Sequence, residues 1–421
     1  MAMQSTQSII AGFDIGSNQI TCAVGSKDEK SNVIRVLGAA IVPASEGIKA
    51  GAIINMREAS AAVAKAFEES GRFAPDGEIN CMVTAVRGNF IKTSDAKGTA
   101  YPGGDGKVSE EDVENALTSA RRQIKLSQGD EIIQTITKEF KLNGKQSVQD
   151  PLGMKGSSIE VSVHALIASN DNLGNIKDAI EQASGEECDN IVYSYLAASE
   201  ILLTKEDKEQ GCLVVDFGGL TTALIHYYNG VIKHSGEIIL KNEASVGSDH
   251  ITKDIMSKFK TSYAIAKKLK EEYGMAYKPN GFKDEEVEYE TADGRKKKLK
   301  RSELIDLIDA RIAQLFYFIE EEMKRVKFTT ENLTGGIILT GGGSNLAGLV
   351  EAFEEHFRGA GLVRVGVPLP EKAIGPDNII RNPAYSAAIG AMTDVLSTEF
   401  FERGKKSSGM FGKLKELWGK I

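Results

Sequence analysis

The chain has 421 residues, of which 41% are hydrophobic and 26% are charged, and its formal net charge is -8. One hydrophobic core stops growing beyond roughly 250–300 residues, so this length predicts at least two domains with a cleft between them. The composition excludes a disordered chain and a membrane-spanning one. The acidic balance argues against a nucleic-acid partner, which needs a basic face on the folded domain.

The spacing of the cysteines and the composition of the N-terminus indicate where in the cell the protein is located. Cys22, Cys81, Cys188 and Cys212 are far apart, with no CxxC pair and no histidine at metal-ligand spacing. We interpret them as buried small hydrophobic residues in a reducing compartment. Residues 1–7 lack a basic stretch followed by an apolar run of signal-peptide length, and no segment is long enough to span a membrane. The cytoplasm is therefore expected.

Two segments share one plan. In Ile9–Val24 and again in Cys212–Tyr228, an apolar strand reaches an aspartate, a glycine-containing turn follows, and a second strand begins. A strand, turn and strand unit that recurs about two hundred residues later indicates an internally repeated fold. We expect two lobes that each begin with the same hairpin.

Two further segments lie between and after these hairpins. Residues 81–169 contain a helix with a Ser-x-x-Asp start at Ser109–Ile124 and strands at Ile133–Leu142 and Ser158–His164, which is typical of an inserted module. Residues 245–300 predict two helices followed by a hairpin with an Asp-Gly turn. This second module would be a small subdomain.

A third glycine cluster comes late in the chain. The strand Gly336–Leu339 runs into the turn TGGGSN, and a helix is predicted over Leu346–Phe357. A strand, a glycine turn and a helix N-terminus form a site that can contact an anion or a nucleotide. We expect this element to line the cleft.

The glycine turns have the residue types that a phosphate chain requires. Glycines let backbone N–H groups approach oxygen atoms without a Cβ in the way, and carboxylates hold the water shell of a magnesium ion. A hairpin from each lobe would clamp the phosphates from opposite sides, and Asp14 and Asp216 would hold Mg2+ through water. Any one of these turns could equally be a plain hairpin corner, but three in this order favour nucleotide binding.

The C-terminal residues differ in composition from the rest of the chain. Residues 403–421 hold six Lys/Arg and one Glu, which is +5 and leaves about -13 on the remainder. Residues 397–409 have the composition of a flexible linker. In 410–421 an apolar face alternates with lysines, as in helices that lie in a membrane interface, although such a helix could also dock on its own protein. The residues assigned to the membrane are Met410, Phe411, Lys413, Leu414, Lys415, Leu417, Trp418 and Ile421.

These motifs resemble those of the actin, heat-shock chaperone and sugar-kinase superfamily. FDIGSNQ resembles the first phosphate motif, VVDFGGLTT the second and IILTGGGSNLAGL the adenosine motif. The stretches SEEDVENALTSARRQIKL, QDPLGMKGSSIEVSVHAL, VGSDHITKDI, LKEEYG and NPAYSAAIGAM resemble the FtsA family of bacterial cell-division proteins in order and spacing. The resemblance covers nearly the whole chain.

The resemblance implies an α/β, actin-like (ribonuclease H-like) two-lobed fold with an inserted α+β subdomain and a C-terminal amphipathic helix. Its implied parts are lobe 1 (1–80, completed by 170–199 and 381–396), the inserted subdomain (81–169), the lobe 2 core (200–234 and 311–380), a small FtsZ-binding subdomain (235–310), the linker (397–409) and the membrane helix (410–421).

The resemblance also implies the residues that contact ATP. They are Asp14, Gly16, Ser17, Asn18, Gln19, Asp216, Gly218, Gly219, Thr221, Thr222, Gly247, Lys270, Gly341, Gly342, Gly343 and Ser344. Gly247, Lys270, Gly342, Gly343 and Ser344 would line the adenosine pocket.

This chain departs from the family pattern near the phosphates. The second turn has Leu220 and Ala223 where the family is more glycine-rich and has an acidic residue. Ser194 stands where hydrolysing relatives place a carboxylate or an amide that orients water. We therefore expect a slow ATPase or an ATP-binding protein without efficient hydrolysis.

The resemblance implies a protein that polymerises, anchors FtsZ filaments to the cytoplasmic face of the membrane at the division site and helps to recruit the divisome. Its partners would be the C-terminal peptide of FtsZ, further copies of itself, anionic membrane lipids and other divisome proteins. Two alternatives stay open: a soluble enzyme of the superfamily, either a sugar kinase or an exopolyphosphatase, and a pilus-assembly protein of related architecture.

Overall fold

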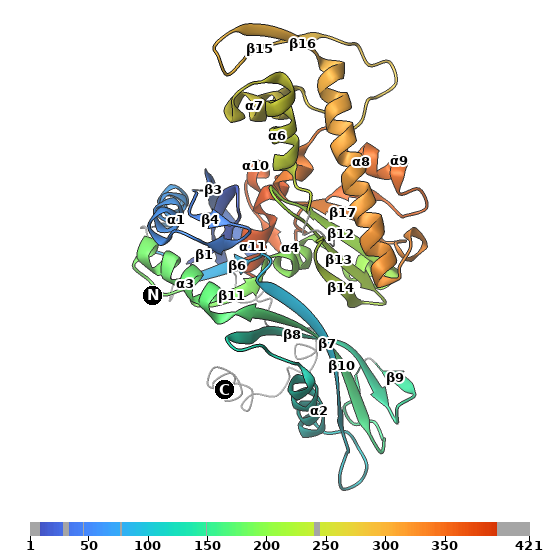
Figure 1. The fold of residues 1–421 in the computed structure, drawn as a ribbon. Coiled ribbons are helices and arrows are strands. Elements are labelled where there is room, and N and C mark those ends of the chain that lie inside the picture. Colours follow the sequence, from blue (N-terminus) through green and yellow to red (C-terminus); the bar gives the residue numbers. More distant parts are fainter. Residues whose placement is uncertain are drawn as a thin grey trace, which may run out of the picture. The chain divides into compact units, whose positions relative to one another are not determined.

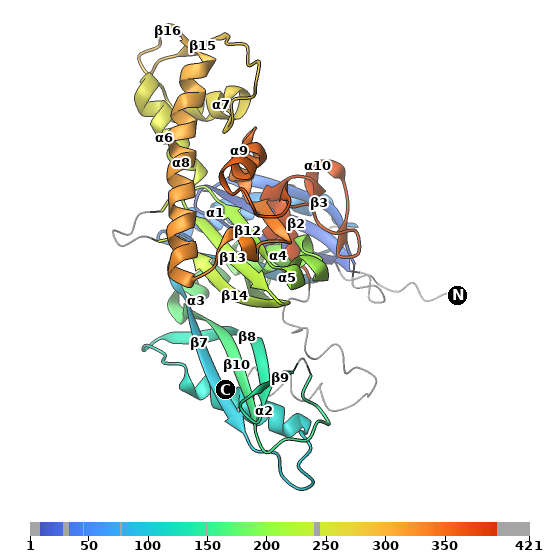
Figure 2. The same cartoon turned by 90° about the vertical axis from the view of Figure 1, so that its right-hand side faces the viewer.

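The computed structural model divides the chain into two compact units (Figures 1 and 2). Among the residues that the structure describes, unit 1 contains those within 9–94, 125–134 and 165–393, and unit 2 contains those within 95–124 and 135–164. The structure describes residues 9–27, 33–44, 46–75, 78–148, 150–239 and 245–393. The linker and the membrane helix predicted over 397–421 lie outside the described residues and stay predictions.

The sheet of lobe 1 has six strands in the order β11-β6-β1-β2-β3-β19. Strands β1, β2 and β3 form an antiparallel meander, whereas β6 lies parallel to β1 and β11 parallel to β6. Their bounds are β1 (Ile9–Ile15), β2 (Gln19–Lys27), β3 (Ile34–Pro43), β6 (Cys81–Val86), β11 (Asn190–Tyr193) and β19 (Ala373–Ile374). The central strand β1 is buried along its whole length.

The sheet of lobe 2 repeats this plan in the order β14-β13-β12-β17-β18. Strands β12, β13 and β14 form the antiparallel meander, and β17 and β18 add parallel strands beyond β12. The bounds are β12 (Cys212–Phe217), β13 (Thr222–Tyr228), β14 (Val231–Glu237), β17 (Gly336–Thr340) and β18 (Val363–Val365). The predicted duplication is confirmed, because each hairpin begins an antiparallel meander whose first strand has two parallel strands beyond it, while β19 is an addition in lobe 1.

Helices cover the sheet of lobe 1. Helices α1 (Met56–Gly71) and α3 (Asn170–Ser184) contribute Val63 and Ile176 to the core around Phe13. Helix α11 (Ser386–Ala391) lies directly on β1, because a Cβ at Gly12 would stand 2.2 Å from the carbonyl oxygen of Ala388. Shorter elements connect the strands and helices along the chain. They are the hairpin of β4 (Ile48–Lys49) and β5 (Ala52–Ile53) and the helices α4 (Ser194–Leu202), α5 (Lys205–Gln210) and α10 (Asp377–Ile380).

Lobe 2 carries the second predicted module. It consists of α6 (Ser248–Phe259), α7 (Tyr263–Tyr273), β15 (Glu286–Glu290) and β16 (Lys296–Lys300), and the long helix α8 (Arg301–Val326) follows it. Figure 1 shows α8 extending from the hairpin past the sheet of lobe 2, and one apolar core joins α8 to that sheet through Leu315, Leu213 and Leu224. The two predicted helices and the hairpin are confirmed, and acidic β15 faces basic β16, as in the pair Glu286–Lys298 at 3.2 Å.

The described part of unit 2 lies within the predicted insertion 81–169. Strands β7 (Ile91–Ala100), β10 (Ile159–Ser169), β8 (Asp130–Leu142) and β9 (Gln146–Val148) pair in that order, and α2 (Glu110–Gln123) accompanies them. Ser109 caps α2 through a reciprocal bond with Asp112, as the sequence predicts. A Cβ at Gly98 would lie 2.0 Å from the carbonyl oxygen of Ala116, so only glycine lets α2 pack this closely on β7.

One predicted element begins later than expected. The helix expected over Leu346–Phe357 is the shorter α9 (Leu349–His356), and a 3₁₀ turn over Gly342–Asn345 precedes it. Gly348 has a φ of 73°, a left-handed conformation that interrupts any continuous helix from the glycine turn. The helices of the described residues include none that is long and apolar enough to cross a membrane.

Candidate functional site

The two glycine turns have the same backbone geometry. In the turn between β1 and β2, the N–H of Gly16 donates to the carbonyl of Gln19 at 3.0 Å. In the turn between β12 and β13, the N–H of Gly218 donates to the carbonyl of Thr221, also at 3.0 Å. A Cβ would stand 2.8 Å and 2.9 Å from those carbonyl oxygens, so both turns need glycine for the same reason.

An aspartate precedes each turn at an equivalent place in its sheet. Asp14 lies near the end of β1, opposite Ala85 of the parallel neighbour β6. Asp216 lies near the end of β12, opposite Thr340 of the parallel neighbour β17. Both residues are buried, with 7% and 4% of their surface exposed. Each lobe therefore presents one buried carboxylate beside its turn.

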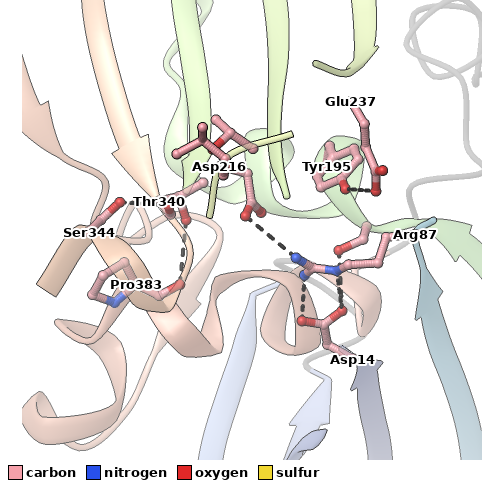
Figure 3. Close-up of polar contacts among 11 residues, drawn as sticks. Asp14, Arg87, Tyr195, Asp216, Glu237, Thr340, Ser344 and Pro383 are labelled. Carbon is pink, nitrogen blue, oxygen red and sulfur yellow. Dashed lines mark hydrogen bonds and ion pairs between the residues drawn. The ribbon is translucent and has the colours of Figure 1, made fainter. Parts of the chain in front are cut away.

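Arg87 joins these two carboxylates (Figure 3). It follows β6, and its Nε and Nη2 donate to Oδ1 and Oδ2 of Asp14 at 3.1 and 2.5 Å. Its Nη1 lies 3.5 Å from Oδ1 of Asp216. The guanidinium thus makes a bidentate pair with the lobe 1 carboxylate and one longer contact with the lobe 2 carboxylate. Burial by itself would lower the pKa of Arg87, but the charges of Asp14 and Asp216 raise it, so Arg87 is a permanent cation.

Three further polar side chains surround this cluster. The hydroxyl of Ser194 donates to Oδ1 of Asp14 at 3.3 Å. The ring of Tyr195 lies 5.4 Å from the guanidinium carbon of Arg87, and its hydroxyl donates to Oε1 of Glu237 at 2.6 Å. Glu237 ends β14, so this chain of contacts runs from α4 to the sheet of lobe 2 (Figure 3).

Burial perturbs the acids of the cluster. It raises the pKa of Asp216, which the charge of Arg87 only partly offsets. It also raises the pKa of Glu237, against the hydrogen bond from Tyr195. Charged groups that lose water without full compensation favour their neutral forms. The positive charge of Arg87 therefore does not fully compensate the burial of the two lobe 2 acids, Asp216 and Glu237.

The two turns touch each other. A Cβ on Gly219 would lie 2.7 Å from Nδ2 of Asn18. Behind them, the hydroxyl of Ser17 accepts the N–H of Gly51 at 3.2 Å, and the hydroxyl of Thr222 donates to the carbonyl of Val246 at 2.6 Å. Each turn is thus fixed to its own lobe and lies against the other.

The third glycine cluster completes the lobe 2 side. A Cβ on Gly341 would stand 2.5 Å from Oδ1 of Asp216, and one on Gly343 would stand 2.6 Å from the ring of Phe217. A Cβ on Gly342 would lie 3.4 Å from Nε2 of Gln19 in the first turn. Ser344 donates to the carbonyl of Thr340 at 2.6 Å. The third glycine cluster therefore packs against both glycine turns.

The remaining predicted adenosine residues lie on α6 and α7. Gly247 is the N-cap of α6, and a Cβ there would lie 2.3 Å from the carbonyl oxygen of Gly219. The N–H groups of Ser248 and Asp249 donate to the carbonyls of Gly218 and Gly219 at 2.9 and 2.8 Å, so the start of α6 is bonded to the second turn. Lys270 of α7 reaches the same place, because its Nζ donates to the carbonyl of Ser248 at 3.1 Å.

Sequence reasoning missed Arg87, Tyr195 and Glu237. No glycine motif marks Arg87, and the only available signal was its position just after a predicted strand, in the run VTAVRG. Tyr195 adjoins Ser194, which the sequence did single out. Glu237 lies outside the motifs, at the end of the third strand of the lobe 2 meander.

A magnesium ion coordinated directly by Asp14 and Asp216 does not fit this arrangement. Both carboxylates already accept from one guanidinium, and no third carboxylate, histidine or cysteine joins them, since the described ranges hold no group of three such side chains that could bind a metal. A nucleotide fits better: backbone and small side chains of two opposed turns, a lysine and a fixed cation are suited to an anionic ligand.

Solved structures of similar fold define the class of protein. A chain of the PilM-PilN type IV pilus biogenesis complex matches with a TM-score of 0.64 and 15% identity, covering 93% of this chain and 99% of its own. MreB 5 of Spiroplasma citri bound to AMPPNP matches with a TM-score of 0.51 and 13% identity, covering 98% and 99%. At these identities the likeness concerns the fold alone. The repeated lobes and opposed turns make this an actin-like protein.

The family follows from sequence comparison. The model described as "Cell division protein FtsA" matches residues 213–390, and "SHS2 domain inserted in FTSA" matches residues 88–167. FtsA of Neisseria meningitidis serogroup B is 29% identical over 393 residues, which are 93% of this chain and 91% of that protein. FtsA of Escherichia coli K12 is 27% identical over 399 residues, and FtsA of Bacillus subtilis is 28% identical over 384. The chain belongs to the FtsA family, as its motifs predict.

Proposed function

We propose that this actin-like cell-division protein binds ATP between its two glycine turns, polymerises, and attaches FtsZ filaments to the membrane. The observation that supports nucleotide binding most directly is the pairing of two equivalent turns, one from each lobe, on either side of a fixed cation. Backbone N–H groups of such turns and a positive charge are the recurring parts of phosphate sites.

Nucleotide binding would separate the two turns. Asn18 lies against Gly219, in the space where phosphates would enter. A bound nucleotide would therefore replace this contact and couple its presence to the relative position of the lobes. Because the hydroxyl of Ser194 donates to Asp14, and a hydroxyl is a poor general base, we propose binding with slow hydrolysis.

Titration of a fluorescent ATP analogue into the purified chain tests this proposal. We expect saturable binding that unlabelled ATP displaces. The variant Gly219→Lys would fill the space between the turns and should abolish binding, whereas Gly174→Lys, on the open surface of α3, should bind normally. Failure of the parent chain to bind, with its fold intact, would refute the nucleotide site.

Membrane attachment is proposed for residues 410–421. Their apolar face and lysines suit an interfacial helix on an anionic leaflet, where each basic residue adds about 1 kcal/mol. One short helix binds reversibly, so polymerisation would strengthen attachment through avidity. Co-sedimentation with anionic liposomes should recover the full chain in an ATP-sensitive manner and should leave a chain truncated after Ser408 in the supernatant. Equal recovery of both chains would refute the anchor.

The FtsZ peptide is proposed to bind the small subdomain of lobe 2. A pocket of about 560 Å³ lies between α8, α9 and the segment 276–278, with Ile305 and Ala352 among its apolar residues and Lys278 and Arg358 among its cations. The lining also holds Asp306 and Glu355, which pair with Lys278 and Arg358, so it would accept a short peptide with an apolar anchor and polar or charged groups that exchange with these exposed ion pairs. The peptide's identity comes from family membership.

Anisotropy with a labelled C-terminal FtsZ peptide tests this pocket. The exposed cations make suitable substitutions: Lys278→Glu and Arg358→Glu should weaken binding about tenfold together, by reversing two charges at the pocket. Lys268→Glu, on the exposed face of α7, is the matched control and should change binding by less than about twofold. Unchanged binding of the double variant would place the peptide elsewhere.

A further inference from the structure

The position of Arg87 suggests a role that the family motifs do not contain. Its guanidinium lies between the two carboxylates that the sequence assigns to magnesium. The side chains of Arg87, Asp14 and Asp216 are 14%, 10% and 5% exposed, so this is a buried ionic cluster rather than a surface pair. We propose that Arg87 is the resident cation of the nucleotide site, and that this chain binds nucleotide phosphates without a divalent metal ion. This inference rests on the proposed nucleotide binding.

The surrounding backbone fixes the position of Arg87. Gly88 has a φ of 129°, and a Cβ there would stand 2.4 Å from the carbonyl oxygen of Ala50. A Cβ on Gly51 would stand 2.1 Å from the carbonyl oxygen of Arg87 itself. Two glycines therefore let the segment after β6 and the segment before α1 approach within backbone contact. The backbone of Arg87 is therefore held in this contact, and its side chain starts from a fixed position beside the two carboxylates.

The side-chain contacts of Arg87 fix its direction. The bidentate pair with Asp14 orients the guanidinium plane, and the ring of Tyr195 lies 5.4 Å from its central carbon. The contacts with Asp14 and Asp216 use three of the five N–H groups of a guanidinium. Phosphate oxygens match the planar, forked geometry of the guanidinium, which a flexible lysine would not provide.

The occupied geometry argues against a metal ion at the position of Arg87. Magnesium keeps a rigid octahedral shell of oxygens at about 2.0–2.1 Å, usually including several waters. To reach Asp14 and Asp216 it would have to displace a guanidinium from a buried bidentate pair, and a guanidinium and a metal ion side by side would repel each other. One cation can hold this position, and the chain supplies it covalently.

The experiment compares nucleotide affinity with and without metal. Affinity for the fluorescent ATP analogue is measured in excess EDTA and in millimolar Mg2+, for the parent chain and for Arg87→Ser. We expect the dissociation constants of the parent chain to agree within about threefold. Arg87→Ser frees both carboxylates and should bind at least about tenfold more weakly in EDTA, with recovery in Mg2+.

Arg364→Ser is the matched control. Arg364 forms a comparable partly buried pair with Asp207 at 3.1 Å, at β18 on the edge of the lobe 2 sheet. The affinity of the Arg364→Ser chain for the ATP analogue should be the same with and without Mg2+. Arg87→Lys keeps the charge but loses the bidentate geometry, so it should stay independent of metal with weaker binding.

The outcomes separate this inference from the proposed function. If the parent chain binds only with Mg2+, the inference is wrong and the nucleotide site stands. If the parent chain binds in neither condition, nucleotide binding itself is wrong, and Arg87 is a structural clasp between the lobes. The comparison of the parent chain in two buffers decides both points even if Arg87→Ser does not fold.

Discussion

The two glycine turns have one backbone and two electrostatic environments. Their closing hydrogen bonds are both 3.0 Å long, and each follows a buried aspartate at the end of a central strand. Asp14 accepts a bidentate pair from Arg87 and a hydroxyl from Ser194, whereas Asp216 has one contact at 3.5 Å and a raised pKa. Duplicated sequence thus gives duplicated geometry, and the side chains that reach in from elsewhere make the two halves different.

The largest predicted effect comes from removing the shared cation. Arg87→Ala leaves two buried carboxylates without their shared cation, so we expect the free energy of unfolding to fall by about 3–5 kcal/mol. Urea unfolding followed by circular dichroism measures it. Arg364→Ala, a pair with 29% of the arginine side chain exposed, should cost about 1 kcal/mol. Equal losses in the two variants would show that Arg87 is an ordinary ion pair.

The next effect distinguishes the two carboxylates. Asp14→Asn breaks the bidentate pair and should lower the free energy of unfolding by about 3 kcal/mol. Asp216→Asn removes a charge that is poorly compensated and should cost less than about 1 kcal/mol. The same urea titrations provide the measurement. If Asp216→Asn proved the more damaging substitution, the asymmetry between the turns would be reversed.

Because the two turns have the same backbone geometry, replacing the glycine of either turn should destabilise the protein by the same amount. In Gly16→Ala and Gly218→Ala the new methyl group would meet a carbonyl oxygen at 2.8 and 2.9 Å, so both should lose about 1–3 kcal/mol of unfolding free energy. Gly174→Ala is a suitable control within α3, since nothing lies within 4 Å of its Cβ, and it should gain about 0.5–1 kcal/mol. A large difference between the two turn variants would mean that their geometries are not equivalent.

The smallest effect is a dependence on pH. Because the folded pKa of Asp216 is raised, ionising this carboxyl costs the folded state more than the unfolded state. Its favourable contribution is present below the unfolded pKa of about 3.9 and is lost as the pH rises through the folded value. Stability curves of the parent chain and of Asp216→Asn should therefore diverge in favour of the variant as the pH rises from acid to neutral. Parallel curves would show that Asp216 does not titrate differently in the two states.

Local patterns in the sequence predicted most of the fold. Apolar alternation and aspartate-glycine turns identified both hairpins, and Ser109 with Asp112 identified the start of α2. The TGGGS turn lies against both glycine turns, and its role in nucleotide binding stays a prediction. The helix after it was predicted three residues too early, because Gly348 adopts a left-handed conformation that breaks the helix, and apolar periodicity does not reveal such a break.

What the sequence by itself determined is the set of turns and their order, because a glycine turn after a strand depends on residues that are neighbours in the chain. Only the tertiary structure decided what lies between the turns. Arg87 is 73 residues from Asp14 and 129 residues from Asp216, and no motif connects the three. Their meeting depends on β6 pairing with β1 and on the two lobes lying together, and these long-range contacts determine the charge of the site.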